Sequence, residues 1–278
     1  MSSDPVGIIG VGLVGSVIAD RLAVAGHAVC GFDIGGIEND EVDALADSEE
    51  VFSRCEVVLL SLPDSTVVGE VLSEASLRES HLVIDTSTGK PEDAIAHGQI
   101  LKAAGGSYIE ATVAGSSDLL SKGEAPLFLG GEEGAIARGE VILDALAGER
   151  FHIGEVGMAA RFKLMFNLVL GLHRAVLAEA LAFGESQGIA SGDALAVLRR
   201  TPAFSSVMDT KGERMVARDY RPPQARLSQH LKDVRLMIES CASLPLSQLH
   251  CQLLETAESL GFGDADTSAI AEAYHQGN

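Results

Sequence analysis

The stretch GIIGVGLVGSVIADRLAVAG, residues 7–26, constrains the fold more than any other part of the chain. Gly10, Gly12 and Gly15 form a G-x-G-x-x-G pattern directly after a short apolar run and at the start of an amphipathic one. The first glycine permits a tight turn, the second lets backbone approach a pyrophosphate, and the third lets a helix pack closely on a strand. Three glycines in a turn can be merely structural, but the order strand, glycines, helix favours a dinucleotide-binding turn whose phosphates sit at the helix N-terminus.

The rest of the first half alternates short apolar runs with helical patterns. Continuous apolar strands that alternate with helices indicate a parallel sheet covered on both faces. After Gly157 the strand signal disappears and helical periodicity continues to the end of the chain. We therefore predict a Rossmann-type, doubly wound α/β domain over residues 1–157, joined by a long helix to an all-α domain over residues 158–278. The predicted strands are 6–10, 27–33, 56–64, 81–88, 107–111, 126–131 and 151–153, and helices are predicted over 16–25 and 133–146.

An acidic residue, Asp33, ends the second predicted strand, 18 positions after Gly15. A carboxylate at this place accepts hydrogen bonds from the adenosine ribose hydroxyls and repels a 2′-phosphate. The residues that follow, IGGIEND, contain no arginine that would bind that phosphate. The pattern predicts NAD, with NADP less favoured; an aspartate that only caps a turn is the alternative.

Composition narrows the function classes. A formal net charge of −20 and the lack of a Lys/Arg run disfavour nucleic acid and anionic membranes as partners. The four cysteines are scattered without C-x-x-C spacing, which is typical of buried thiols in a reducing compartment rather than of a disulfide or metal framework. No basic-then-apolar leader precedes the first strand, and the longest apolar stretch is shorter than the ~18 residues of a membrane span. We expect a soluble, cytoplasmic protein without a metal site.

Residues 160–167, ARFKLMFN, place two polar side chains on an apolar helix. Lys163 and Asn167 are four positions apart, so they share one helix face. The next position on that face is Gly171, which would leave room beside them. The plain interpretation of Lys163 is a side chain whose stem packs and whose tip reaches water. The cofactor pattern and Asn167 favour a functional pair instead.

Taken together, these stretches and several others resemble the β-hydroxyacid dehydrogenase family, which includes 3-hydroxyisobutyrate dehydrogenase and tartronate semialdehyde reductase. The resemblance covers nearly the whole chain, and it is the order of the motifs rather than any single one that is specific. The motifs are the N-terminal glycine pattern, SLPDS (61–65), DTSTGKP (85–91), GEAPLFLGG (123–131), Gly157 with Lys163 and Asn167, LKD (231–233) and DADTSAI (264–270).

The resemblance implies a role for each matching residue. Lys163 would be the catalytic general acid and base for hydride transfer between a nicotinamide cofactor and a small 3-hydroxy acid or semialdehyde. Lys232 would close over the nicotinamide end, with Asp233 holding the lysine or its helix. The implied cofactor contacts are Gly10, Gly12, Leu13, Val14, Gly15, Asp33, Leu62, Pro63, Thr88, Lys232 and Asp233, and the implied substrate contacts are Ala114, Gly115, Ser116, Asn167 and Lys232.

The main departure from the family pattern is EATVAGSS, residues 110–117, where relatives usually read D-A-P-V-S-G-G. Ala114 replaces the serine of the pocket for the substrate carboxylate and Ser116 replaces a glycine, while Gly115 persists. The anionic group of the substrate is therefore open. Two alternatives stay in view: an imine reductase-like enzyme on the same fold, and a non-catalytic NAD-binding sensor. The resemblance and the apolar second half also imply a homodimer or homotetramer.

Overall fold

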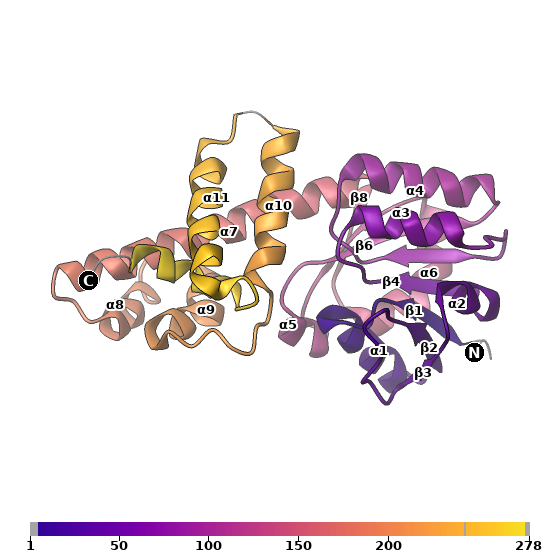
Figure 1. Cartoon of the computed structure of the whole chain (residues 1–278), viewed down its shortest axis with the longest axis horizontal. Coiled ribbons are helices and arrows are strands. Elements are labelled where there is room, and N and C mark those ends of the chain that lie inside the picture. The colour runs from indigo at the N-terminus through magenta and orange to yellow at the C-terminus, as the bar shows by residue number, and fades with distance from the viewer. Residues whose placement is uncertain (1–4, 242, 276–278) are drawn as a thin grey trace. The chain divides into compact units, whose positions relative to one another are not determined.

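The computed structural model describes residues 5–241 and 243–275. The chain divides into two compact units, Met1–Lys163 and Leu164–Asn278, and each is described by itself. The first unit is a sheet covered by helices, and the second is helical (Figure 1). Both match the predicted architecture, whereas the boundary at residue 157 stays a prediction.

The first unit is built on one eight-stranded sheet of order β3-β2-β1-β4-β5-β6-β7-β8. Strands β3 to β6 in this order are all parallel, as predicted, and they form the strand order of a dinucleotide-binding fold. The pair β6–β7 is antiparallel and β8 runs parallel to β7, so the predicted parallel sheet ends in two strands that run opposite to the other six. The strands are β1 Val6–Ile9, β2 Val29–Phe32, β3 Val42–Ala44, β4 Val57–Leu60, β5 Leu82–Asp85, β6 Ser107–Val113, β7 Leu127–Gly130 and β8 Arg150–Gly154.

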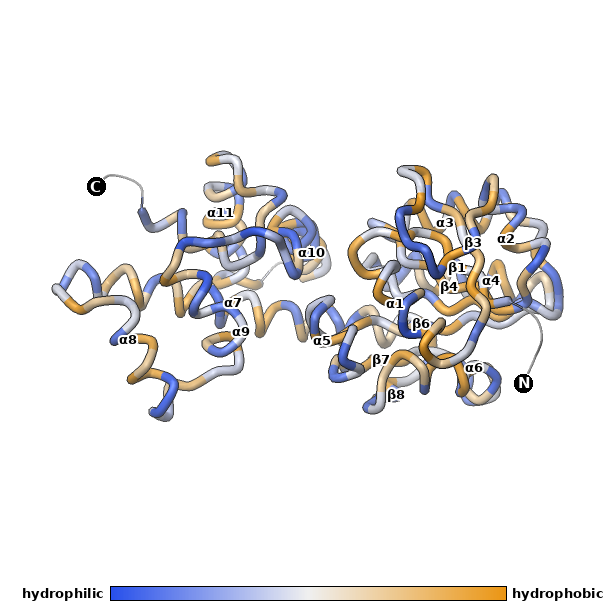
Figure 2. Tube along the Cα trace, turned by 90° about the horizontal axis from the view of Figure 1, so that it is seen from below, coloured by the Kyte–Doolittle hydropathy of each residue, from blue (hydrophilic) through white to orange (hydrophobic). Residues whose placement is uncertain are grey.

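Helices bury their apolar residues against both faces of this sheet. One hydrophobic cluster joins α1, α5 and α6 to one set of strand side chains, and a second cluster joins α2, α3 and α4 to another set of strand side chains. Figure 2 shows hydrophobic residues concentrated along the strands between these helices. The helices are α1 Leu13–Val24, α2 Ser48–Arg54, α3 Ser65–Glu74, α4 Pro91–Ala103, α5 Ser117–Ser121 and α6 Glu133–Leu146.

Three details of the first unit differ from the predicted elements: the direction of β7, the presence of β3 and the start of α1. Residues 114–126 connect β6 to β7 and contain only the five-residue helix α5, which is shorter than the helix that usually crosses a sheet between parallel strands; the pair is antiparallel. Strand β3 has three residues, too few for an apolar run, and was not predicted. Helix α1 begins at Leu13, directly after Gly12, rather than at residue 16.

The helical unit is organised along α7, which spans Met158–Ser186 and begins within the first unit. It is the one helix among the described residues that is long and apolar enough to cross a membrane, yet 44% of its most apolar window is buried in protein. Three polar residues on its buried face, Lys163, Asn167 and Arg174, fit a core helix instead. The elements that follow are α8 Ser191–Leu198, α9 Ser206–Ala217, α10 Leu227–Ser240, α11 Pro245–Ala257, η1 Glu258–Phe262 and η2 Thr267–Tyr274.

The sequence predicted open space beside Gly171, but the structure shows side chains there. The structure fills it with two imidazole rings: a Cβ at Gly171 would lie 2.5 Å from both His230 Nε2 and His250 Cε1. Burial, followed by the charge of Arg174, lowers the pKa of His250 to about 4, so this ring is neutral at neutral pH. Gly171 therefore permits helix packing and does not leave an open space, because both rings come from helices more than fifty residues away.

A glycine pair in the first turn gives a direct test of the packing of α1. A Cβ at Gly15 would lie 1.9 Å from the Gly10 carbonyl oxygen, whereas a Cβ at Gly12 would have no described atom within 4 Å. We expect Gly15→Ala to lower the free energy of unfolding by about 1–3 kcal/mol, because the helix must move off the strand. Gly12→Ala, the matched control, should cost less than about 1 kcal/mol. Urea unfolding curves measure both, and equal losses would contradict the packing argument.

Candidate active site

The glycine turn between β1 and α1 has the shape that a dinucleotide needs. Gly10 has φ +89°, and a Cβ there would lie 2.3 Å from the Ser61 carbonyl oxygen, so only glycine fits. Gly12 is the N-cap of α1 and borders open space. Leu13 is exposed and Val14 is half-buried in the first turn of the helix. These residues fit a dinucleotide, because backbone N–H groups at the start of α1 can face phosphates without an obstructing side chain.

Asp33 follows β2 and contacts this turn directly. Its Oδ2 accepts a hydrogen bond from the Val11 N–H at 2.7 Å, and its Oδ1 accepts one from the Gly35 N–H at 2.7 Å. A carboxylate has about four lone-pair sites, so two backbone bonds do not exhaust it. The geometry is compatible with ribose binding and also with the alternative of a turn cap, because the bond to Gly35 is an Asx turn.

The other predicted cofactor residues of this unit lie in loops that follow β4 and β5. The Leu62 N–H donates to Ser87 Oγ at 3.0 Å, which joins the two loops. Pro63 is exposed and Thr88 is half-buried. Helix α4 begins at Pro91, and proline at the first helical position loses no hydrogen bond. Because β1, β4 and β5 are parallel, both loops and the glycine turn emerge at the same edge of the sheet.

Lys163 lies in the second turn of α7, with an exposed fraction of only 8%. Its Nζ donates a hydrogen bond to the Val113 carbonyl oxygen at 2.6 Å. Val113 is the last residue of β6, which runs parallel to β5, so this bond holds the ammonium at the carboxyl edge of the sheet. Ligands of open α/β sheets bind at that edge. A side chain that only reaches for water would not be held in this way.

In the helical unit, Asp233 brings two predicted site residues together. Asn167 Nδ2 donates to Asp233 Oδ2 at 2.8 Å, and Lys232 Nζ lies 3.3 Å from Asp233 Oδ1. Asn167 and Asp233 are both buried. The family resemblance implied that Asp233 would hold Lys232 or its helix, but it did not imply the bond to Asn167, which joins residues 66 positions apart.

Some of the hydrogen-bonding groups in the predicted substrate loop, residues 114–116, already have partners within the protein. The Ala114 N–H donates to the Pro126 carbonyl oxygen at 2.8 Å. This bond continues the β6–β7 pairing, so the Ala114 amide does not point freely into the loop. Ser116 is the N-cap of α5, and its Oγ accepts from the Leu119 N–H at 3.4 Å. The Ser116 hydroxyl still has its own proton to donate. Gly115 is half-buried between these two residues.

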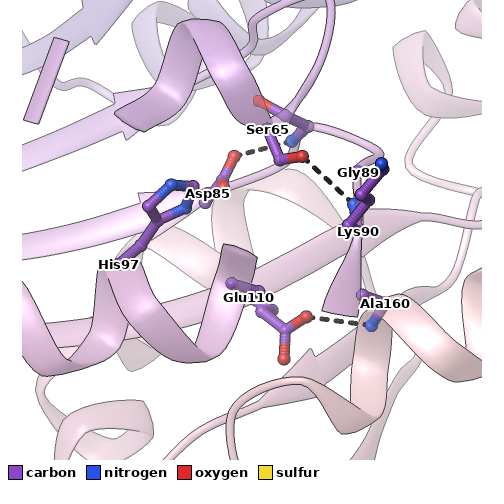
Figure 3. Close-up of a pocket in the computed structure, with 9 residues that line it drawn as sticks. Ser65, Asp85, Gly89, Lys90, His97, Glu110 and Ala160 are labelled. Carbon is purple, nitrogen blue, oxygen red and sulfur yellow. Dashed lines mark hydrogen bonds between the residues drawn. The ribbon is translucent and has the colours of Figure 1, made fainter. Parts of the chain in front are cut away.

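A buried acidic group that the sequence did not single out lies near the start of α7. Figure 3 shows a small cavity lined by Ser65, Asp85, Gly89, His97, Glu110 and Ala160. Burial raises the pKa of both carboxyls, Asp85 and Glu110, and lowers the pKa of the His97 imidazole. The available signal was an acidic residue within each of two predicted strands, Asp85 in 81–88 and Glu110 in 107–111.

Comparisons with known proteins agree with this arrangement. The family model described as the NAD binding domain of 6-phosphogluconate dehydrogenase matches residues 5–154. The model described as the NAD-binding domain of NADP-dependent 3-hydroxyisobutyrate dehydrogenase matches residues 157–274.

Individual relatives extend over the whole chain. A 2-(hydroxymethyl)glutarate dehydrogenase of Eubacterium barkeri is 24% identical, covering 98% of this chain and 95% of its own. A 2-hydroxy-3-oxopropionate reductase of Escherichia coli is 27% identical, covering 96% of each. The crystal structure of a 3-hydroxyisobutyrate dehydrogenase from Salmonella typhimurium has the same fold, with a TM-score of 0.87, 24% identity and coverage of 97% and 99%. The chain therefore belongs to the β-hydroxyacid dehydrogenase family and is a nicotinamide-dependent oxidoreductase.

Proposed function

We propose that the protein interconverts a small anionic 3-hydroxy acid and its semialdehyde, with Lys163 as the general acid and base. The observation that carries this proposal is the buried Lys163 ammonium, bonded to the Val113 carbonyl at the carboxyl edge of the sheet. A bound nicotinamide supplies or accepts the hydride. Lys163 Nζ would give a proton to the substrate oxygen during reduction and take it back during oxidation. Val113 would orient the ammonium, and Asn167, itself oriented by Asp233, would hold the substrate.

The altered loop at residues 114–116 governs the choice of anionic group. Ala114 has no hydroxyl and its amide is already bonded to Pro126, so the loop offers Gly115 and Ser116 as donors. We include sulfonate and phosphonate analogues in the substrate class for this reason. An imine reductase-like activity and a non-catalytic sensor are not favoured, since the sequence relatives that the chain matches over nearly their whole length are named for hydroxy acid or semialdehyde chemistry.

The catalytic role predicts that Lys163→Ala loses turnover and keeps cofactor binding. We expect kcat to fall by roughly 10²–10⁴-fold, the usual contribution of general acid–base catalysis, while the Kd for NADH changes little. Steady-state rates over a panel of semialdehydes and 3-hydroxy acids, with NADH fluorescence titration, measure both. Lys102→Ala is the matched control, because Lys102 is exposed and paired with Glu132. Full turnover in Lys163→Ala would refute the role of this lysine.

We also propose NAD as the preferred cofactor, on the strength of the Asp33 carboxylate beside the glycine turn. Asp33→Asn keeps one oxygen for the Val11 N–H and removes the negative charge that would repel a 2′-phosphate. The ratio of kcat/KM for NADH over NADPH should then fall about tenfold, which corresponds to about 1.4 kcal/mol. Asp43→Asn, an exposed acid on the neighbouring strand β3, is the control. An unchanged ratio would leave Asp33 as a turn cap.

A homodimer or larger assembly is proposed from an apolar stripe on α7. Met165, Val169, Val176 and Phe183 are exposed, and their spacing of 4, 7 and 7 places them on one helix face. A stripe of this length on a helix otherwise packed in protein fits burial against a second copy. A cytoplasmic location stays a prediction that rests on the scattered spacing of the four cysteines in the sequence.

The stripe predicts that charge on α7 separates the subunits. Val176→Asp and Phe183→Asp, at positions 66% and 65% exposed, should convert the assembly to monomers in sedimentation velocity. Val24→Asp, on α1 and 91% exposed, should leave the sedimentation coefficient unchanged. A wild-type protein that already sediments as a monomer would contradict the proposed assembly.

A further inference from the structure

Glu110 is a buried carboxylate in the middle of strand β6, with an exposed fraction of 2%. Its side chain reaches the start of α7: Oε2 accepts from the Gly157 N–H at 2.5 Å, and Oε1 accepts from the Ala160 N–H at 2.9 Å. Figure 3 shows the second of these bonds, with the Glu110 carboxylate turned toward Ala160. Gly157 has no side chain, so it cannot itself accept from the unpaired N–H groups at the start of α7. A strand residue supplies that acceptor.

The surroundings of this carboxylate are shaped to admit it. Gly130 lies opposite Glu110 in the β6–β7 pair, and a Cβ at Gly130 would lie 2.3 Å from Glu110 Oε2. Gly157, which donates the shorter bond, has φ +95°, a conformation that favours glycine. Both glycines are therefore needed for the carboxylate to reach the helix.

The carboxylate also suits the electrostatics of a helix start. An anion is stabilised near a helix N-terminus, where unpaired N–H groups carry partial positive charge. Burial raises the pKa of Glu110, while the hydrogen bonds from Gly157 and Ala160 oppose that shift. The backbone N–H groups at the start of α7 therefore replace hydrogen bonds to water that the Glu110 carboxylate loses on burial.

The same strand and the same helix make a second contact at Lys163. Val113 follows Glu110 by three positions on β6, and Lys163 follows Ala160 by three positions on α7, a rise of about 4.5 Å. Strand β6 therefore contacts α7 twice, through the Glu110 carboxylate and through the Val113 carbonyl bonded to Lys163 Nζ. Two contacts on adjacent turns fix both the rotation and the translation of this part of the helix.

We propose that Glu110 is a positioning residue: it holds the first turn of α7 so that the Lys163 ammonium stays on the Val113 carbonyl, at the place where it serves the reaction. This inference rests on the proposed role of Lys163. Its effect on the substrate is indirect, through the placement of α7.

The test compares Glu110→Gln and Glu110→Asp with the wild type. The glutamine keeps one acceptor oxygen but presents an NH₂ to the other backbone donor, so one bond is lost. We expect kcat to fall about tenfold or more, since misplacement by 1 Å can cost 10²-fold, with the Kd for NADH within about twofold of wild type. Glu110→Asp, which keeps two carboxylate oxygens, should recover part of kcat.

Tyr108→Phe is the matched control for stability alone. Its hydroxyl donates to Asp85 Oδ2 at 2.6 Å, so the variant removes a buried hydrogen bond on the same strand without touching the start of α7. It should lower the melting temperature and leave kcat unchanged. If Tyr108→Phe lowers kcat as much as Glu110→Gln, or if Glu110→Gln and Glu110→Asp keep wild-type kcat, the positioning role is overturned.

Lys163→Ala distinguishes this failure from failure of the proposed function. A Lys163→Ala variant without turnover, beside a fully active Glu110→Gln, removes the positioning role and leaves the catalytic role of Lys163 standing. Full turnover in Lys163→Ala overturns both. Should Glu110→Gln not fold, the kcat of Glu110→Asp relative to Tyr108→Phe decides the question.

Discussion

One hydrogen bond, from Lys163 Nζ to the Val113 carbonyl, joins the start of α7 to the end of strand β6. A buried ammonium without an acceptor would be costly, so the end of β6 and the second turn of α7 constrain each other. The sheet places its glycine turn and its cofactor loops at the same edge, because β1, β4, β5 and β6 are parallel. Lys163, the proposed proton-transfer group, and the glycine turn therefore belong to the same compact unit.

Several acidic side chains, one of them half-buried and two of them buried, accept hydrogen bonds from specific partners. Asp33 accepts from the glycine turn, Asp233 orients Asn167, and Glu110 accepts from the start of α7. In each case an acid holds an element that carries a proposed cofactor or substrate contact. The net charge of −20 is therefore not only a surface property, because some acidic side chains, such as Glu110 and Asp233, are buried and accept hydrogen bonds there.

Local pattern predicted most of the fold. The glycine turn, the alternation of strands and helices, and helix α6 at Glu133–Leu146 follow from periodicity and from the conformational freedom of glycine. The direction of β7 and the three-residue β3 did not, since strand direction depends on the path of the connection and short strands carry no periodic signal.

The sequence identified candidate site residues, but it did not identify the residues that they contact. Lys163 and Asn167 stood out as polar residues on an apolar helix, whereas their partners Val113 and Asp233 lie 50 and 66 positions away. Spacing along one helix cannot reveal such partners. The two imidazoles beside Gly171 show the same limit, because a glycine on a helix face is equally consistent with open space and with close packing.

The facing positions 110 and 130 also act as a constraint on sequence change. The Glu110 carboxylate occupies the volume that any side chain at position 130 would need. A larger residue at 130 is compatible only with a shorter one at 110, so substitutions at these two positions should be correlated as sequences diverge. A mutation at one of them would be tolerated chiefly in the background of the other, and the order in which the two changes occur would decide whether an intermediate sequence folds.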